Sequence, residues 1–197
     1  GCFDGQLLLD LSKFFNKYKL FGYDVNKHLK QLFPKKSNFY FITGNLNKIN
    51  EKFDLIIMSH SLMYIKDLDS KLQIIKKFLN KDGIVYIQIP NLSINPFYSL
   101  MSDQFQFPTE NSIKNVLKLN NFVPKIIKKK VFIKELIILA KKGKHKNKIK
   151  LINDSVYEQA LVKIKNIKNK LSKIPNSQLT VLGTTINAAF VDEVLPK

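Results

Sequence analysis

An alternation of apolar runs with amphipathic stretches constrains the fold of this chain more than any other feature. Residues 53–59 (FDLIIMS) are almost continuously apolar, which is typical of a parallel strand buried on both faces. Residues 68–79 carry apolar side chains on one helical face, and Asp82-Gly83 then predicts a turn into a second apolar run at residues 84–89. Strands that alternate with helices in this way predict an α/β fold with a doubly wound, mostly parallel sheet.

The same alternation continues on both sides of this unit. Upstream, the sequence predicts a helix at residues 7–15, a strand at 19–23, a helix at 26–32 and a strand at 38–42. Downstream, it predicts a capped helix at residues 109–119 and two strands, at 123–130 and 131–140, that pair antiparallel. We expect a hinge at Asn120-Asn121, between this helix and the two strands.

A composition break divides the chain. Residues 143–155 are rich in lysine, and we interpret them as a solvated linker that follows a domain at residues 1–142. Beyond the linker, residues 156–174 have apolar side chains at the spacing of an amphipathic helix. Residues 179–195 repeat the strand, glycine turn and helix of the chain's opening. We therefore expect residues 156–197 to contain a helix and the start of a second small α/β unit.

The net charge of +18 comes from lysine alone, because all 33 basic residues are lysine. Arginine makes the bidentate contacts that read bases and clamp phosphates, so its absence argues against sequence-specific nucleic-acid recognition. Lysine, isoleucine and asparagine are abundant together, as in an AT-rich coding sequence. We interpret most of the charge as composition bias, and a charge selected for an anionic partner remains the alternative.

Other residue types limit the kind of site and compartment. The single cysteine, Cys2, excludes an internal disulfide framework and a metal site built from cysteines. No group of His, Asp and Glu has the spacing of metal ligands, so we expect no metal. The sequence has neither a signal-peptide pattern nor a run approaching the roughly twenty apolar residues that a spanning helix needs. We therefore expect a cytoplasmic protein without a membrane span.

Residues 1–24 combine glycines, the start of a helix and an acid. Gly1 and Gly5 flank a turn that opens the first helix, and Asp24 ends the short strand that follows. Such a turn lets a ligand approach the backbone, and an acid about twenty residues further on can accept hydrogen bonds from a ribose. This pattern indicates a nucleotide-type cofactor site, although a tight turn and a helix-capping acid would look the same. We expect the strand that normally precedes such a turn to be missing.

In total, the domain resembles a class I S-adenosylmethionine-dependent methyltransferase of the small-molecule or sugar-modifying kind. The resemblance rests on five segments in register: residues 1–8 (GCFDGQLL), Asp24, residues 43–46 (TGNL), residues 53–67 (FDLIIMSHSLMYIKD) and residues 78–91 (FLNKDGIVYIQIPN). It implies a Rossmann-like methyltransferase sheet that lacks its first strand here, and S-adenosylmethionine as cofactor. It also implies that residues 179–195 begin a truncated Rossmann-like accessory domain.

The resemblance also implies which residues hold the cofactor. Asp24 falls where the family binds the ribose hydroxyls, and Asn45 falls where an acidic or amide residue meets the adenine. Asn45 as a plain turn residue stays open as the alternative. The expected cofactor-binding residues are Gly1, Phe3, Asp4, Gly5, Asp24, Asn45, Leu46 and Ser59.

On the acceptor side, the sequence departs from its relatives. Many of them carry Glu-His where this chain has Met63-Tyr64, and a His-Glu-His segment where it has residues 102–104 (SDQ). The candidates for proton transfer are therefore His60, the Tyr64 hydroxyl and Asp103. A structural histidine, and a lid loop at residues 91–107 without chemistry, are the alternatives.

The function implied by the resemblance is methyl transfer to a small molecule, most plausibly a sugar or nucleotide-sugar of surface-polysaccharide biosynthesis. The protein's part in such an in-line displacement is to hold donor and acceptor close and aligned. One alternative is an RNA or protein methyltransferase that uses the lysine-rich surface, although methylation of base nitrogens is disfavoured because the NPPY-type motif is absent. The other is a non-catalytic nucleotide-binding or scaffold domain. The oligomeric state is left open.

Overall fold

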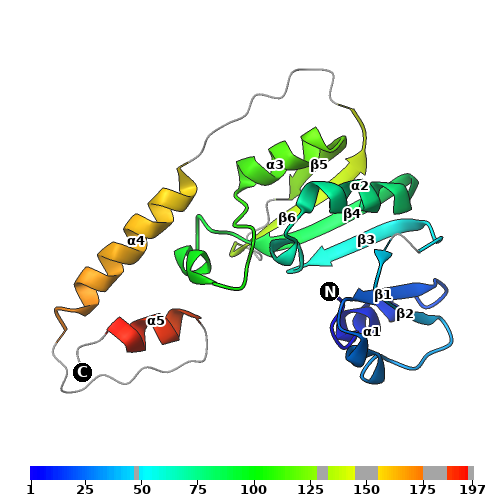
Figure 1. Cartoon of the computed structure of the whole chain (residues 1–197), viewed down its shortest axis with the longest axis horizontal. Coiled ribbons are helices and arrows are strands. Elements are labelled where there is room, and N and C mark those ends of the chain that lie inside the picture. The colour runs from blue at the N-terminus through cyan, green and yellow to red at the C-terminus, as the bar shows by residue number, and fades with distance from the viewer. Residues whose placement is uncertain (47–48, 128–132, 145–154, 175–185, 195–197) are drawn as a thin grey trace. The chain divides into compact units, whose positions relative to one another are not determined.

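The computed structural model describes residues 1–46, 49–127, 133–144, 155–174 and 186–194 (Figure 1). Contacts along the chain divide it into two compact units, Gly1–Lys52 and Phe53–Lys197. Each unit is described by itself.

The first unit is a pair of parallel strands with helices at their ends. Strand β1 (Leu20–Asp24) pairs with β2 (Phe39–Thr43), and Leu20 lies opposite Phe39. Helix α1 (Gln6–Ser12) precedes β1, and a 3-10 helix, η1 (Lys27–Gln31), follows it. The ring of Phe33 lies 5.2 Å from that of Phe41, and aromatic packing of this kind stabilises the small unit.

The second unit holds a four-stranded sheet in the order β3-β4-β6-β5. Strands β3 (Phe53–Ser59) and β4 (Leu79–Pro90) are parallel, whereas β6 (Glu135–Lys142) runs antiparallel to β4 and to β5 (Phe122–Ile127). The predicted α/β class and the predicted antiparallel pair are confirmed. The described pairings in the two units are thus divided between parallel and antiparallel.

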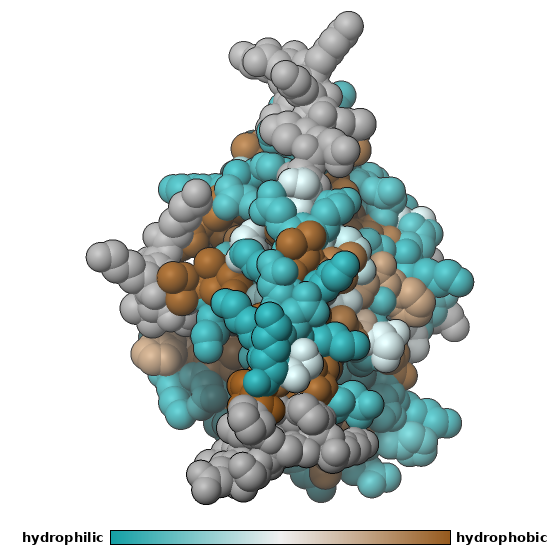
Figure 2. Space-filling model, turned by 90° about the vertical axis from the view of Figure 1, so that its left-hand side faces the viewer, coloured by the Kyte–Doolittle hydropathy of each residue, from teal (hydrophilic) through white to brown (hydrophobic). Residues whose placement is uncertain are grey.

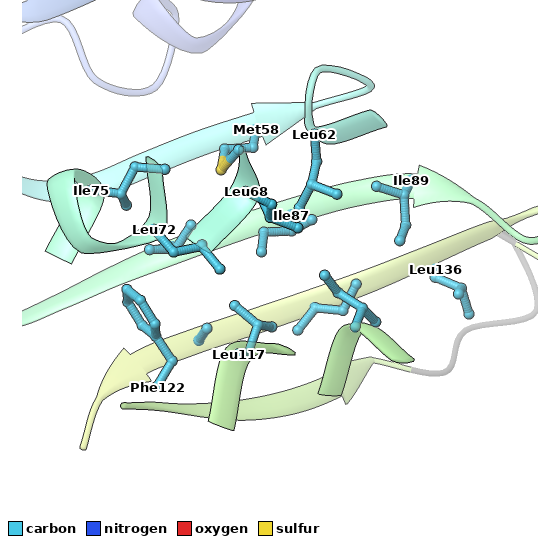
Figure 3. Packing of buried hydrophobic residues seen from close by; sticks show 14 of the residues in the cluster. Met58, Leu62, Leu68, Leu72, Ile75, Ile87, Ile89, Leu117, Phe122 and Leu136 are labelled. Atoms are coloured by element: carbon cyan, nitrogen blue, oxygen red, sulfur yellow. The ribbon is translucent and has the colours of Figure 1, made fainter. Parts of the chain in front are cut away.

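Helices α2 (Leu68–Phe78) and α3 (Glu110–Leu119) pack on one face of this sheet (Figure 1). Figure 3 shows Leu72 and Leu117 reaching from the two helices toward Ile87 of β4, and all three side chains are fully buried. Every second residue of β4 faces this core, as the two-residue period of a strand requires. The core lies between one sheet face and two amphipathic helices, as the sequence pattern predicted.

The sequence was misleading at two points in this sheet. Asp82-Gly83 does not turn the chain, because β4 runs through it, with a shift of register between Phe53 and Leu55 of β3. A side chain at Gly83 would lie 2.8 Å from the carbonyl oxygen of Phe53, so close packing requires the glycine. Strand β3 is also not buried on both faces: it buries Met58, but Leu55 is 45% exposed, because the two helices cover the other face.

The pair Asn120-Asn121 is not a hinge. Asn120 is the C-cap of α3 and is buried, and its amide donates to the carbonyl oxygen of Val116 at 2.9 Å. Asn121 takes the left-handed conformation (φ 61°), and its carbonyl oxygen accepts from the N–H of Gly143 at 3.0 Å. The chain is therefore held firmly where α3 turns into β5.

The C-terminal helices belong to the second unit. Helices α4 (Val156–Leu171) and α5 (Ile186–Val194) pack on a 3-10 helix, η4 (Pro96–Leu100), where Phe97 lies 5.2 Å from Phe190. Figure 2 looks at the side on which these helices lie and shows hydrophilic side chains broken by small hydrophobic patches. No described helix is both long and apolar enough to cross a membrane.

Two sequence predictions concern residues outside this description. Most of the predicted linker and the predicted strand near residues 179–185 lie outside the described residues, and only the helix after that strand, α5, is seen. The division of the chain at residue 142 and the truncated accessory domain therefore stay predictions.

Candidate active site

The glycine loop at the chain's start is joined to the end of β1. The N–H of Cys2 donates to the carbonyl oxygen of Tyr23 at 2.8 Å, and the N–H of Gly5 donates back to Cys2 at 3.0 Å. Gly5 is the N-cap of α1 with φ 85°, and a side chain there would come within 2.9 Å of Phe33 and Pro34. Backbone conformation and packing both require glycine at this position.

Asp24 joins this loop to the strand that it ends. One carboxylate oxygen accepts from the N–H of Phe3 and the other from the N–H of Asn26, both at 3.0 Å. The N-cap of η1 is Asn26, which accepts from His28, so Asp24 is not the helix cap that the sequence allowed. Each oxygen of Asp24 still has a lone pair, and two such acceptors side by side fit the two hydroxyls of a ribose.

The loop after β2 contains the other predicted cofactor residues. The Tyr23 hydroxyl donates to the carbonyl oxygen of Gly44 at 2.8 Å, which ties this loop to β1. Gly44 has φ 82°, and a side chain there would meet nothing within 4 Å, so the glycine faces open space. Asn45 and Leu46, the predicted adenine contacts, follow directly in the chain. The carboxylate of Asp24 therefore fits a ribose, and the adenine contacts stay predictions.

Asp4 has a local role. Its carboxylate accepts from the N–H of Gln6 at 3.0 Å, in the first turn of α1. Phe3, by contrast, is 65% exposed and has a left-handed backbone (φ 49°). A ligand at this loop would therefore meet the backbone and ring of Phe3 rather than the Asp4 carboxylate.

His60 follows β3 directly and takes a backbone conformation that is uncommon for a residue with a side chain. Its φ is 48°, and its N–H donates to the carbonyl oxygen of Gln88 at 2.9 Å. Ser59, which was predicted to bind cofactor, donates its hydroxyl to the Gln88 side chain at 3.4 Å. Left-handed residues of this kind are concentrated at functional sites. The carboxyl ends of β3 and β4 thus bring Ser59, His60 and Gln88 together.

Glu135 completes this cluster, and sequence reasoning missed it. It is the first residue of β6, opposite Pro90 of β4, and its Oε2 lies 3.4 Å from Nε2 of His60. The Glu135 side chain is 18% exposed, and Oε2 is buried without a hydrogen-bond partner. Burial raises the pKa of Glu135, and the charge of His60 opposes this with a smaller effect. A single acid at the head of an apolar strand (ELIILA) was the available signal.

Two tyrosines lie near this carboxylate. The hydroxyl of Tyr86 donates to the Gln88 side chain at 3.3 Å, and Tyr98 is carried by η4. Burial raises the pKa of both tyrosines, and the negative charge of Glu135 raises it further. The hydroxyls therefore stay protonated at neutral pH and can donate hydrogen bonds.

The other two acceptor-side candidates lie on neighbouring loops. Tyr64 ends the 3-10 helix η3 (Leu62–Tyr64) and is 46% exposed, and Asp103 is exposed. The backbone N–H groups of Phe105 and Gln106 donate to the carbonyl oxygen of Met63, which places the Asp103 loop beside η3. Within the described parts of the chain, no hydrogen bond or ion pair joins Tyr64 or Asp103 to His60. No three metal-ligating side chains gather anywhere in the described ranges.

Comparison with known proteins identifies the family of this domain. A family model described as a methyltransferase domain matches residues 1–180. A search of the curated proteins finds no match.

Solved structures share the fold at low sequence identity. Human N-acetylserotonin methyltransferase, in complex with S-adenosylmethionine, is 21% identical over 73% of this chain and 46% of its own, with a TM-score of 0.61. The chain thus spans less than half of that protein. The plantazolicin methyltransferase, crystallised with a monoazolic desmethylPZN analog and S-adenosylhomocysteine, is 16% identical over 73% of this chain and 74% of its own, with a TM-score of 0.59. An S-adenosylmethionine-dependent methyltransferase from Clostridium acetobutylicum is 17% identical over 72% of this chain and 81% of its own, with a TM-score of 0.51. This chain belongs to the methyltransferase domain family, and it shares its fold with S-adenosylmethionine-dependent methyltransferases.

Proposed function

We propose that this protein transfers a methyl group from S-adenosylmethionine to a hydroxyl-bearing small molecule. Within that class, the acceptor that we favour is a sugar or nucleotide-sugar of surface-polysaccharide biosynthesis. The match of the family model to residues 1–180 supports the reaction, and relatives crystallised with S-adenosylmethionine or S-adenosylhomocysteine support the cofactor.

The first unit would hold the cofactor. Asp24 would accept from the ribose hydroxyls, Asn45 and Leu46 would meet the adenine, and the loop at residues 1–5 would offer its backbone to the methionine part. When bound, S-adenosylmethionine supplies an electrophilic methyl group on a sulfonium. Asp24 and the loop contribute position only, which is the main requirement of an in-line displacement.

The observation that carries the choice of acceptor is the polar cluster around His60. The carboxyl ends of β3 and β4 and the start of β6 bring together the side chains of Ser59, His60, Tyr86, Gln88 and Glu135. Hydroxyl, amide and carboxylate groups can each exchange hydrogen bonds with a molecule that carries several hydroxyls. These side chains support a small polar acceptor.

The lysine-rich surface favours a different acceptor, RNA or a protein. On α4, five lysines (Lys163, Lys165, Lys168, Lys170 and Lys173) lie on or just after the helix and are exposed. Contacts to phosphates made by lysine alone depend strongly on salt and carry little sequence information. We therefore keep this acceptor class as the second candidate, with a non-catalytic scaffold as the third. The cytoplasmic location stays part of the proposal.

Two measurements test the proposal. Calorimetry should show binding of S-adenosylmethionine and S-adenosylhomocysteine, and the absence of binding would contradict it. Transfer of a radioactive methyl group should then be measured with UDP- and dTDP-hexoses, with an RNA duplex and with a lysine-free peptide. Label in the hexose fraction supports the favoured acceptor. Label that appears only in RNA or peptide would replace it with the second candidate.

A further inference from the structure

We propose that Glu135 is the positioning residue of His60, and that His60 takes the proton of an acceptor hydroxyl during methyl transfer. This inference rests on the proposed function and deepens it, because it makes the reaction an O-methylation. It adds a residue that the sequence did not single out. It also explains why His60 has a left-handed backbone conformation.

The two side chains are held in place from different strands. His60 is fixed at the end of β3 by its left-handed backbone and by its bond to the carbonyl oxygen of Gln88. Glu135 is fixed by the antiparallel register of β6 with β4, which places it opposite Pro90. Groups on paired strands are positioned more precisely than groups on a free loop.

The contact between His60 and Glu135 is longer than a typical hydrogen bond. The distance from Nε2 to Oε2 is 3.4 Å, beyond the usual range of about 2.7–3.2 Å for such bonds. Catalytic hydrogen bonds are often long before substrate binds and shorten afterwards. An Nε2–H aimed at Glu135 keeps the imidazole in the tautomer that leaves a lone pair on Nδ1.

The chemistry then follows without a further reactant. As the acceptor oxygen forms its bond to the methyl carbon, its hydroxyl proton moves to Nδ1 of His60. Bound S-adenosylmethionine would supply the methyl carbon, and its sulfur would keep the electron pair of the broken carbon–sulfur bond. The carboxylate of Glu135 stabilises the positive charge that the imidazole ring gains.

The surroundings of Glu135 favour this role over a purely structural one. Tyr86 of β4, Tyr98 of η4 and His60 after β3 are the titratable groups that face it. Among the described residues, the only basic side chain within ion-pair distance of Glu135 is His60, which is 44% exposed and so accessible to an acceptor. A buried carboxylate oxygen without a hydrogen bond is costly, and an apolar or amide side chain would serve packing better.

Two-bond proton–nitrogen NMR of the histidine rings in the full chain tests the inference without any substrate. The signals of His60 can be assigned by their loss in His60→Asn. We expect the Nε2–H tautomer in the wild type, and a larger share of Nδ1–H in Glu135→Leu, whose side chain has no acceptor oxygen. An unchanged tautomer in Glu135→Leu would overturn the inference.

Activity provides the second arm, with the hexose acceptors above. We expect Glu135→Gln to lower kcat by about tenfold or more, with S-adenosylmethionine affinity unchanged. In a His60→Asn background the same change should have little further effect, because both residues act through one proton transfer. Glu110→Gln is the matched control, since Glu110 pairs with Lys114 on α3, outside the cluster.

The outcomes separate the two proposals. An active wild type with an equally active Glu135→Gln would overturn the role of Glu135 alone. If Glu135→Gln lowered kcat equally in the wild-type and His60→Asn backgrounds, the role of Glu135 would also be overturned, since the effect would then be structural. A wild type that methylates no hydroxyl would contradict the proposed function itself.

Discussion

The side chain of Gln73, on α2, donates a hydrogen bond of 2.7 Å to the side chain of Asn120, at the end of α3. Asn120 in turn donates to Asp69 of α2 and to Val116 of its own helix. One buried amide therefore joins the ends of the two helices that cover the sheet.

We expect Asn120→Ala to lower the free energy of unfolding by about 1–3 kcal/mol, because it removes a buried amide together with its hydrogen bonds to Gln73 and Asp69. Urea unfolding of the full chain measures the effect. Asn121→Gly is the control: Asn121 has φ 61°, which glycine adopts without strain, so its stability should stay close to that of the wild type. Equal losses from both changes would contradict the role given to Asn120.

Asp24 is expected to determine cofactor affinity. Asp24→Ala removes both carboxylate acceptors and should weaken S-adenosylmethionine binding by about tenfold or more, whereas Asp24→Asn, which keeps one oxygen, should be intermediate. Calorimetry measures the two affinities. Asp10→Ala is the matched control, because Asp10 pairs with Lys13 on the surface of the same unit. An affinity equal to that of the wild type in Asp24→Ala would remove the ribose role.

The two left-handed glycines of the first unit should respond differently to alanine. Both substitutions carry a backbone cost of about 1–2 kcal/mol, since φ is 85° at Gly5 and 82° at Gly44. At Gly5 the added carbon also comes within 2.9 Å of Phe33 and Pro34, which adds about 1–3 kcal/mol, whereas at Gly44 it meets open space. The Tm of Gly5→Ala in thermal unfolding should therefore be lower than the Tm of Gly44→Ala. The reverse order would show that the loop at Gly5 packs differently.

Glu135 gives a prediction about pH. Burial raises its pKa in the folded protein above the ordinary value of 4.5. Below that value the side chain is protonated in both the folded and the unfolded states. As pH rises from 4.5 through the raised pKa, the unfolded chain ionises more readily than the folded one, so this residue's contribution to stability is lost.

Glutamine is neutral throughout, and Glu135→Gln should escape that loss. The Tm of Glu135→Gln relative to that of the wild type should therefore be higher at about pH 8 than at about pH 4. Thermal melts at both pH values measure it. A difference that stays constant with pH would show that the carboxylate is well solvated.

Local patterns in the sequence predicted the elements of the first unit well. The glycine turn, β1 and Asp24 lie within residues 1–24, so their geometry depends mostly on neighbours along the chain. Strand β3 was also placed at its observed bounds, because its apolar run has clear ends. The role of Gly83 inside β4 was not predictable, since it depends on a contact with Phe53, far back in the chain.

The acceptor side was predictable only in part. His60 could be proposed because it follows a strand, but its partner Glu135 is brought to it by the pairing of β4 with β6. No local pattern specifies that register, and a single glutamate at a strand start has many ordinary explanations. Tyr64 and Asp103 were chosen by position in a resembling family, and their roles stay predictions.

The short helix η4 has one further consequence. It holds Tyr98 close enough to Glu135 to feel the charge of that carboxylate. It also packs against α4 and α5, and the rings of Phe97 and Phe190 meet at this contact. Under the proposed function, substitutions in the last part of the chain would change which acceptors are methylated without altering any residue of the cluster around His60. A new substrate preference would then arise through the C-terminal helices, with the proposed role of His60 kept.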